Sequence, residues 1–165
     1  MKTLYTRAAG ALLAASALLV THGAARADGP VPSTGRPAED FAALCNATGP
    51  DAAPALRATV DALRAVSGAA TCEDAGRALA ATSFLDLHGK GLSDLRPVAL
   101  FTGLRTLDLG RNAITDLAPL ATLTELTALG LKENRAADLA PLASLRRLTS
   151  LSVEANGVVS VAPLA

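Results

Sequence analysis

The second half of the chain repeats one pattern of apolar and polar positions every 22 residues. The rows begin at Leu85, Leu107, Leu129 and Leu151, and positions 1, 3, 8, 11, 14, 17 and 20 are apolar wherever the chain supplies them. Positions 1 and 3 predict a short strand with one buried face, and the later spacing of three predicts a return segment that points its apolar side chains to a common axis. A single coil cannot bury its own core, so the coils must stack with their strands in a parallel sheet.

A more specific motif lies inside these rows. Residues 107–114 and 129–136 match the leucine-rich repeat pattern L-x-L-x-x-N-x-L. Their shared continuation, Asp-Leu-Ala-Pro-Leu at 116–120 and 138–142, resembles the short 22-residue class of bacterial internalin-like surface and secreted proteins. The resemblance implies an α/β solenoid over residues 85–165, with parallel β-strands, short helical or 3-10 return segments, three complete repeats and one incomplete repeat.

Residues 38–84 follow a helical pattern instead. Pro37 suits a first helical position, and two acidic residues follow it near the positive end of the helix dipole. A second helix is predicted over about 53–66, and a third opens at 71–74 with a signal that resembles a capping box. Their apolar stripes are too narrow for an independent core. The region resembles the all-helical N-terminal cap of internalin-like proteins and is expected to lie against the first repeat.

The first 27 residues predict a cleavable secretory signal. Two early positive charges precede a largely apolar run over 8–20, and Ala25-Arg26-Ala27 supplies a cleavage site near Ala27. A membrane anchor is the alternative, but this run is shorter than the roughly 20 residues that a spanning helix needs. Residues 28–37 hold three prolines and two glycines and predict a linker. We therefore expect a secreted or periplasmic protein without a membrane span.

An oxidising compartment favours a disulfide between Cys45 and Cys72. The alternative is a catalytic cysteine, which needs an activating partner. His88 is the one histidine after the leader, and no motif ties it to either cysteine. The disulfide is the favoured interpretation.

Charge and composition restrict the classes of molecule that the chain is expected to bind. Without the first 27 residues the chain carries 12 basic and 15 acidic side chains, and its aromatic residues are only Phe41, Phe84 and Phe101. A mildly acidic, aromatic-poor body lacks the features that bind nucleic acid. We expect no nucleic acid partner, and no motif predicts a cofactor.

The resemblance assigns structural roles to two sets of polar side chains. Repeat-position asparagines are implied to bond through their amides to the backbone of adjacent coils. Aspartates three residues before each repeat proline are expected to accept backbone N–H bonds at a turn, with a metal site as the alternative. The asparagines are Asn112, Asn134 and Asn156, and the turn aspartates are Asp94, Asp116 and Asp138.

Three departures from the repeat pattern stand out. Lys90 replaces the asparagine of the first row, and Ala136 replaces a large aliphatic residue, which removes about 2 kcal/mol or more if the space stays empty. The sequence also lacks a polar terminal cap after Leu164. That edge predicts contact with a partner or with a second copy of the chain.

Function is expected to depend on strand positions 2, 4 and 5, which point outward on the concave face of a curved stack. These positions have mixed charge and no aromatic side chain. The favoured function is non-enzymatic protein or peptide binding through this face. The alternative is a truncated or structural fragment that self-associates through its C-terminal edge. The candidate ligand-binding residues are Asp86, His88, Asp108, Arg111, Lys132, Glu133 and Glu154.

Catalysis has one candidate constellation on the same face. Asp86 and Asp108 are expected to lie about 5 Å apart with His88 beside them, close enough to raise one carboxylate pKa or to recruit a cation. No nucleophile, phosphate loop or H-E-x-x-H motif accompanies them. We therefore predict no catalytic residue and no metal site, and keep a metal-dependent hydrolase as a third hypothesis.

Overall fold

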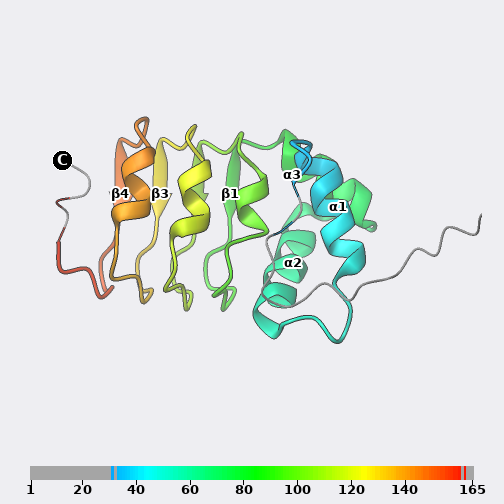
Figure 1. Ribbon diagram of the computed structural model, residues 1–165, viewed down its shortest axis with the longest axis horizontal. Coiled ribbons are helices and arrows are strands. Elements are labelled where there is room, and N and C mark those ends of the chain that lie inside the picture. The colour runs from blue at the N-terminus through cyan, green and yellow to red at the C-terminus, as the bar shows by residue number, and fades with distance from the viewer. Residues whose placement is uncertain (1–30, 32, 161, 163–165) are drawn as a thin grey trace, which may run out of the picture.

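The computed structural model describes residues 31, 33–160 and 162. Three helices lie together at the β1 end of the molecule, and the coils follow one another away from them (Figure 1). The predicted leader, 1–27, lies outside the described residues. The elements are α1 (Pro37–Ala47), α2 (Pro54–Ser67), α3 (Cys72–Ala81), β1 (Phe84–Asp86), η1 (Val98–Leu100), β2 (Thr106–Asp108), η2 (Ala118–Thr122), β3 (Ala128–Gly130), η3 (Ala140–Ser144) and β4 (Ser150–Ser152), where η is a 3-10 helix.

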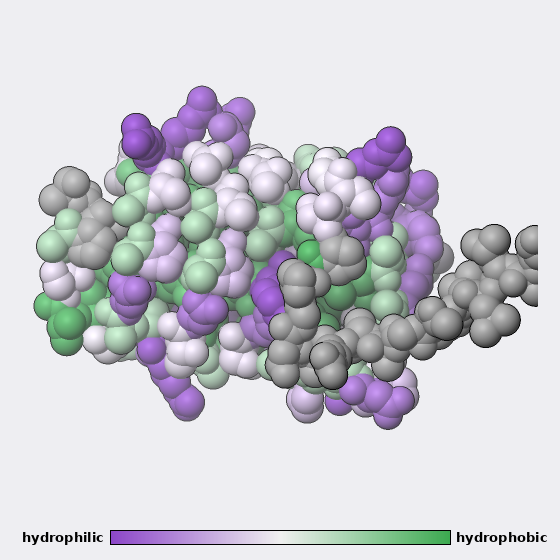
Figure 2. Space-filling model, viewed as in Figure 1, coloured by the Kyte–Doolittle hydropathy of each residue, from purple (hydrophilic) through white to green (hydrophobic). Residues whose placement is uncertain are grey.

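The four strands form one parallel sheet in the order β1-β2-β3-β4. Its register pairs Leu85 with Leu107, Leu107 with Leu129, and Leu129 with Leu151. Equivalent positions of successive rows therefore lie side by side, and side chains of similar hydropathy recur from coil to coil (Figure 2). The predicted solenoid with a 22-residue repeat is confirmed.

The core is a stack of leucine layers. Every predicted apolar position from Leu85 to Leu145 is at most 4 % exposed, and Ala136 is fully buried among them. Leu148 and the apolar side chains of the fourth row at 151, 153 and 158 are only half-buried. The remaining fourth-row positions, Val161 and Leu164, lie outside the described residues. Burial is thus complete in the first rows and decreases toward β4.

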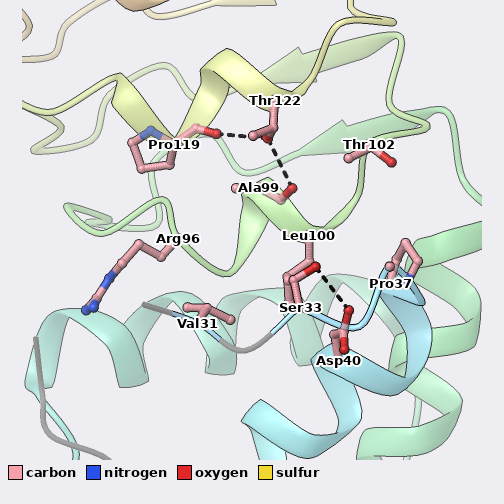
Figure 3. A pocket seen from close by; sticks show the side chains of 11 residues that line it. Val31, Ser33, Pro37, Asp40, Arg96, Ala99, Leu100, Thr102, Pro119 and Thr122 are labelled. Atoms are coloured by element: carbon pink, nitrogen blue, oxygen red, sulfur yellow. Dashed lines mark hydrogen bonds between the residues drawn. The ribbon is translucent and has the colours of Figure 1, made fainter. Parts of the chain in front are cut away.

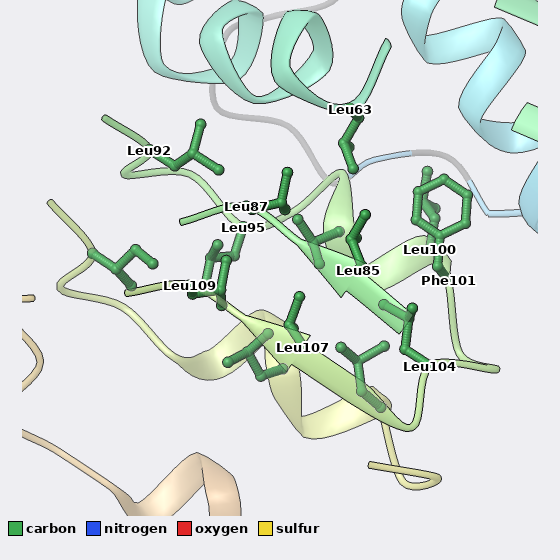
Figure 4. Close-up of a cluster of buried hydrophobic side chains, with 14 of the residues drawn as sticks. Leu63, Leu85, Leu87, Leu92, Leu95, Leu100, Phe101, Leu104, Leu107 and Leu109 are labelled. Carbon is green, nitrogen blue, oxygen red and sulfur yellow. The ribbon is translucent and has the colours of Figure 1, made fainter. Parts of the chain in front are cut away.

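The helices pack directly on the first coil. The ring of Phe41 in α1 lies 5.5 Å from the ring of Phe101, centroid to centroid. The buried Thr59 of α2 donates its hydroxyl proton to the carbonyl oxygen of Asp94 at 2.7 Å. Leu63, also in α2, points toward the leucines of the first row (Figure 4). These contacts join the helices and the first repeat into one hydrophobic core.

The helix boundaries follow local signals in the sequence. Pro37 is the first residue of α1, and Gly68 ends α2 in the left-handed conformation at φ 65°. The Thr71 hydroxyl accepts a hydrogen bond from the backbone N–H of Asp74 and caps α3. The predicted helices are therefore found where the pattern placed them.

A disulfide joins α1 to the first residue of α3. Cys45 and Cys72 are bonded to each other with their Cα atoms 5.8 Å apart. The predicted pairing is confirmed, and the alternative of a free catalytic cysteine is wrong for both residues. Closing a loop with a sequence separation of 27 stabilises the fold by about 3.5 kcal/mol if the stabilisation is entropic.

Helices α1 and α3 also approach each other through their backbones. The buried Gly76 of α3 faces the carbonyl group of Ala38 in α1. A Cβ atom at position 76 would lie 2.2 Å from that carbonyl oxygen. Only a glycine permits this approach, because the contact is with backbone and not with a movable side chain.

Part of the predicted linker is tied to α1. The backbone N–H of Thr34 donates to both carboxylate oxygens of Asp40 at 2.8 and 2.9 Å, and the Thr34 hydroxyl donates at 2.8 Å. These hydrogen bonds, led by the backbone N–H, hold the pKa of Asp40 below its usual value. Val31 packs, partly buried, against the hydrophobic core. Asp40 therefore anchors the preceding segment and does more than complement the helix dipole.

Candidate functional site

One face of the sheet is open to solvent and is called the outer sheet face below. Leu85, Leu107 and Leu129 point away from it into the core, so it is formed by the alternate positions. Its side chains fall into four columns that cross the strands. They are Phe84, Thr106, Ala128 and Ser150; Asp86, Asp108, Gly130 and Ser152; His88, Gly110, Lys132 and Glu154; and Gly89, Arg111, Glu133 and Ala155.

The first column corrects the expectation that this face lacks an aromatic side chain. Phe84 is 58 % exposed and shares the face with Asp86, two residues further along β1. The strand begins at Phe84, one residue before the row position from which the sequence pattern was counted. The alternation of strand positions therefore adds a column that the prediction omitted, and its β1 member is aromatic.

A shallow hollow of about 240 Å³ covers the first two columns. Phe84 and Asp86 lie at its β1 side, and the serines of β4 lie at the other. Ala128 and Gly130 lie between them and leave the space open because their side chains are small. The hollow thus combines an aromatic ring, carboxylates and exposed strand backbone.

The two aspartates of the second column are held in place by the backbone. Asp86 accepts the N–H of His88 at 2.9 Å, and Asp108 accepts the N–H of Gly110 at 2.8 Å, each through Oδ1. In both cases the hydrogen bond spans two residues, so it fixes the carboxylate on the face without burying it. The two residues are directly paired in the β1–β2 register. The structure therefore brings the predicted pair together.

His88 lies beside this pair. Its Nδ1 atom is 3.8 Å from Oδ1 of Asp108, and both side chains are nearly half exposed. A Cβ atom at position 110 would lie 2.7 Å from Nδ1 of His88, and one at position 130 would lie 2.8 Å from Oδ1 of Asp108. The glycines of β3 and of the loop after β2 therefore make room for the imidazole and the carboxylate.

The fourth column has an unusual backbone conformation. Its members Gly89, Arg111, Glu133 and Ala155 have φ angles of 66°, 53°, 57° and 55°. Across the coils, Nε of Arg111 donates to Oε2 of Glu133 at 2.9 Å. The two predicted ligand-binding residues thus neutralise each other, although both remain accessible.

Lys132 and Glu154 continue the third column in the loops after β3 and β4. The Ser152 hydroxyl donates to the carboxylate of Glu154. This hydrogen bond and, more weakly, the positive charge of Lys132 hold the pKa of Glu154 below its usual value. Glu154, like Glu133, therefore has a cation beside it on the outer sheet face.

The repeat asparagines connect the coils. Asn134 is 7 % exposed; its amide nitrogen donates to the carbonyl oxygens of Leu109 at 2.8 Å and Leu131 at 3.0 Å, and its Oδ1 accepts the N–H of Ile114 at 3.0 Å. Asn112 and Asn156 make the equivalent bonds one coil earlier and one coil later. Their amides are fully committed to the backbone.

The turn aspartates accept backbone N–H groups two residues ahead. Asp116 accepts from Ala118 and Asp138 from Ala140, both at 2.8 Å. Asp94 accepts from Arg96 at 3.0 Å and also pairs with its guanidinium group. Burial alone would raise the pKa of Asp94, but the hydrogen bonds and charge of Arg96 outweigh it and lower the pKa.

Lys90 occupies the ladder position of the first row and is exposed. No coil precedes the first row, so an asparagine there would have no earlier coil to bond to.

A second hollow, of about 440 Å³, lies away from the outer sheet face (Figure 3). The segment around Val31 and the start of α1 form one side, and η1 and η2 form the other. Its buried carboxylate, Asp40, is already bonded to Ser33 and Thr34. The hollow therefore offers mainly apolar surface and no free reactive group among its described lining residues.

Within residues 31, 33–160 and 162, no helix is long and apolar enough to cross a membrane. Among the same residues, no three His, Cys, Asp or Glu side chains are grouped so that they could hold a metal ion.

The comparison with solved structures finds internalins among the similar structures. Residues covering 66 % of this chain superpose on 32 % of an internalin, InlF, from Listeria monocytogenes str. 4b F2365, with a TM-score of 0.60 and 28 % sequence identity. The repeat motifs, the register and this match agree. The protein is an internalin-like leucine-rich repeat protein.

Two further internalins from Listeria monocytogenes are similar to this internalin-like protein. Internalin C2 of strain 4b F2365 shares 31 % identity over 55 % of the chain and 50 % of its own length, with a TM-score of 0.44. InlJ shares 31 % identity over 52 % of the chain and 19 % of its own length, with a TM-score of 0.47. The chain thus spans half or less of each of these three structures. No family model matches it, and no curated protein matches it in sequence.

Proposed function

We propose that this internalin-like protein is an exported, non-enzymatic module that binds another protein or a peptide through the outer sheet face, the concave face of the predicted solenoid. The observation that carries the proposal is the continuity of this face over four in-register strands, with an exposed phenylalanine and charged side chains in ordered columns. Buried aromatic and arginine contacts dominate the energetics of protein interfaces. Similarity to internalins supports an interaction role.

The expected leader and the disulfide support export. The Cys45–Cys72 bond is of the kind that persists in oxidising compartments. Cleavage near Ala27 would release the chain from residue 28 onward to the periplasm or the medium. In this proposal the three helices serve as an N-terminal cap, since α1 and α2 cover the leucines of the first coil.

Peptide selection on the outer sheet face tests the proposed function. A phage-displayed library of random dodecapeptides is panned against the chain from residue 28 onward. The selected peptides are then measured on a variant with His88, Arg111, Lys132 and Glu154 all replaced by alanine. We expect the affinity to fall at least about tenfold, because such a change removes roughly 1.4 kcal/mol of contacts.

The matched control replaces the exposed Arg64 of α2 and Arg146 of the third return segment by alanine. This variant removes two cations away from the outer sheet face and is expected to bind the peptides unchanged. If the fourfold variant and a second variant with Phe84→Ala, Asp86→Asn and Asp108→Asn, both folded by circular dichroism, keep full affinity for every selected peptide, binding through the outer sheet face is ruled out.

Self-association through the β4 edge is the second candidate function. It is favoured by the half-buried apolar side chains of the last row, Leu151, Val153 and Val158. A second copy that covered them would add apolar burial and strand pairing. Light scattering on the purified chain should then give a dimer mass that reverts to the monomer mass in Leu151→Lys, while Val66→Lys on α2 leaves it unchanged. A monomer at all concentrations would contradict this candidate.

A further inference from the structure

We propose that the outer sheet face recognises an extended peptide segment whose arginine side chain lies over Phe84, Asp86 and Asp108. The inference rests on the proposed function and names the chemistry of the partner. It depends on three properties of the face. Two aspartates there have no Lys or Arg partner, their geometry is fixed, and an aromatic ring and a hollow lie beside them.

Two carboxylates of the outer sheet face, Asp86 and Asp108, have no Lys or Arg partner among the described residues. The face carries four carboxylates and two cations besides His88. Arg111 is paired with Glu133 at 2.9 Å, and Lys132 acts on Glu154. Asp86 and Asp108 remain, and His88, 3.8 Å from Asp108, is the one ionisable nitrogen that pairs with either of them among the described residues. The complementary partner of these two carboxylates is therefore a cation.

The two aspartates form an ordered acceptor site. Their Oδ1 atoms accept backbone N–H groups within their own loops, which fixes the orientation of both carboxylates. Within the described part of the chain, no hydrogen bond reaches the Oδ2 atom of either residue. Paired positions on adjacent parallel strands are about 4.8 Å apart. A guanidinium group, with five donors in a planar fork, can bond to both carboxylates at once.

The surroundings favour arginine over a small cation. Phe84, with 58 % of its surface exposed, stands next to Asp86, and a guanidinium plane stacks well on an aromatic ring. The hollow of about 240 Å³ that Phe84 and Asp86 border leaves space over Ala128 and Gly130 for an aliphatic side chain of the same segment. An extended peptide that crosses the strands can fill both positions, because its side chains two residues apart point to the same face.

A titration with defined peptides tests the assignment. The probe is acetyl-Leu-Ser-Arg-Ser-Leu-amide, in which the leucines two residues from arginine share its face, and its matched control has citrulline in place of arginine, which keeps the shape and removes the charge. Binding is followed by NMR on the isotope-labelled chain from residue 28 onward. We expect the arginine peptide to shift the amide signals of His88 and Gly110, whose N–H groups bond to the two carboxylates. The citrulline peptide is expected to bind at least about tenfold more weakly.

Matched variants locate the contact. Asp86→Asn with Asp108→Asn keeps the shape of the face and should weaken the arginine peptide at least about tenfold. Asp51→Asn with Asp61→Asn removes two exposed carboxylates near and within α2 and should change nothing. Phe84→Ala should weaken binding of the arginine peptide and reduce, but not abolish, its preference over the citrulline peptide, because the ring is lost and the carboxylates remain.

Equal binding of the arginine and citrulline peptides, or unchanged binding by the Asp86 and Asp108 variant, overturns the inference. The proposed function is judged separately by the peptides selected on the same face. If the selected peptides bind the fourfold alanine variant more weakly than the parent chain, while the arginine probe binds no better than the citrulline probe, the face binds protein by another chemistry. If substitutions on the outer sheet face change the affinity of neither the selected peptides nor the arginine probe, both proposals fail.

Discussion

Replacing Gly76 by alanine is expected to destabilise the protein by about 3 kcal/mol. The added methyl group would lie 2.2 Å from the carbonyl oxygen of Ala38, so α1 and α3 must move apart. The shift would also act on the Cys45–Cys72 bond and on the contact between Phe41 and Phe101, since both involve α1. Urea unfolding monitored by circular dichroism measures the change in the free energy of unfolding.

The direction of this change is diagnostic. In an unhindered helix, alanine is more favourable than glycine by about 1 kcal/mol, so the same substitution would stabilise α3 if the helices were further apart. Gly103→Ala is the matched control, because a Cβ atom there would meet nothing within 4 Å beyond its chain neighbours and its φ is not in the left-handed region. A Gly76→Ala variant as stable as the parent would contradict the close approach of the two helices.

Replacing Asn134 by alanine is expected to lower the free energy of unfolding by about 2 kcal/mol. The variant leaves the N–H of Ile114 without its partner, and it removes one of two amide donors from each of the carbonyl oxygens of Leu109 and Leu131, which still accept from Asn112 and Asn156. Ile114 is fully buried, and an unsatisfied buried polar group carries a penalty of about 1–3 kcal/mol. The midpoint of urea unfolding measures the loss.

Asn156→Ala supplies the comparison for this prediction. Asn156 makes the same set of bonds but is less buried than Asn134, so water can replace part of what the amide provides. The loss should therefore be clearly smaller than for Asn134→Ala. Equal and small losses in the two variants would show that the amides contribute little to stability.

Much of the fold could be predicted because leucine spacing reports it directly. A shift of one residue would move every leucine of a strand to the solvent face, so the pattern at Leu107 and Leu129 determines the register as well as the repeat. The disulfide followed from the number of cysteines and the expected compartment. Both inferences follow from residue types and their spacing, without knowledge of which side chains contact one another in the fold.

The candidate site could be predicted only in part. Phe84 was missed because the row was counted from Leu85, although the strand alternation extends one residue further back. The Arg111–Glu133 pair was visible as two candidates 22 residues apart, but the sequence did not show that they neutralise each other. The bond between Thr34 and Asp40 was hidden in a proline- and glycine-rich segment that predicted only a linker.

The asparagine ladder gives the stack a direction. Each amide accepts a backbone N–H from the loop of the preceding coil, as Asn134 does from Ile114 and Asn156 does from Ala136. Unfolding of the β4 coil therefore removes the hydrogen bond that holds the loop of the third coil, and the same loss then repeats in each earlier coil. Loss of the helices leaves each later coil still closed by its successor. Fraying should thus travel from β4 toward β1, and a ligand bound at β1 and β2 would rest on the part of the sheet that opens last.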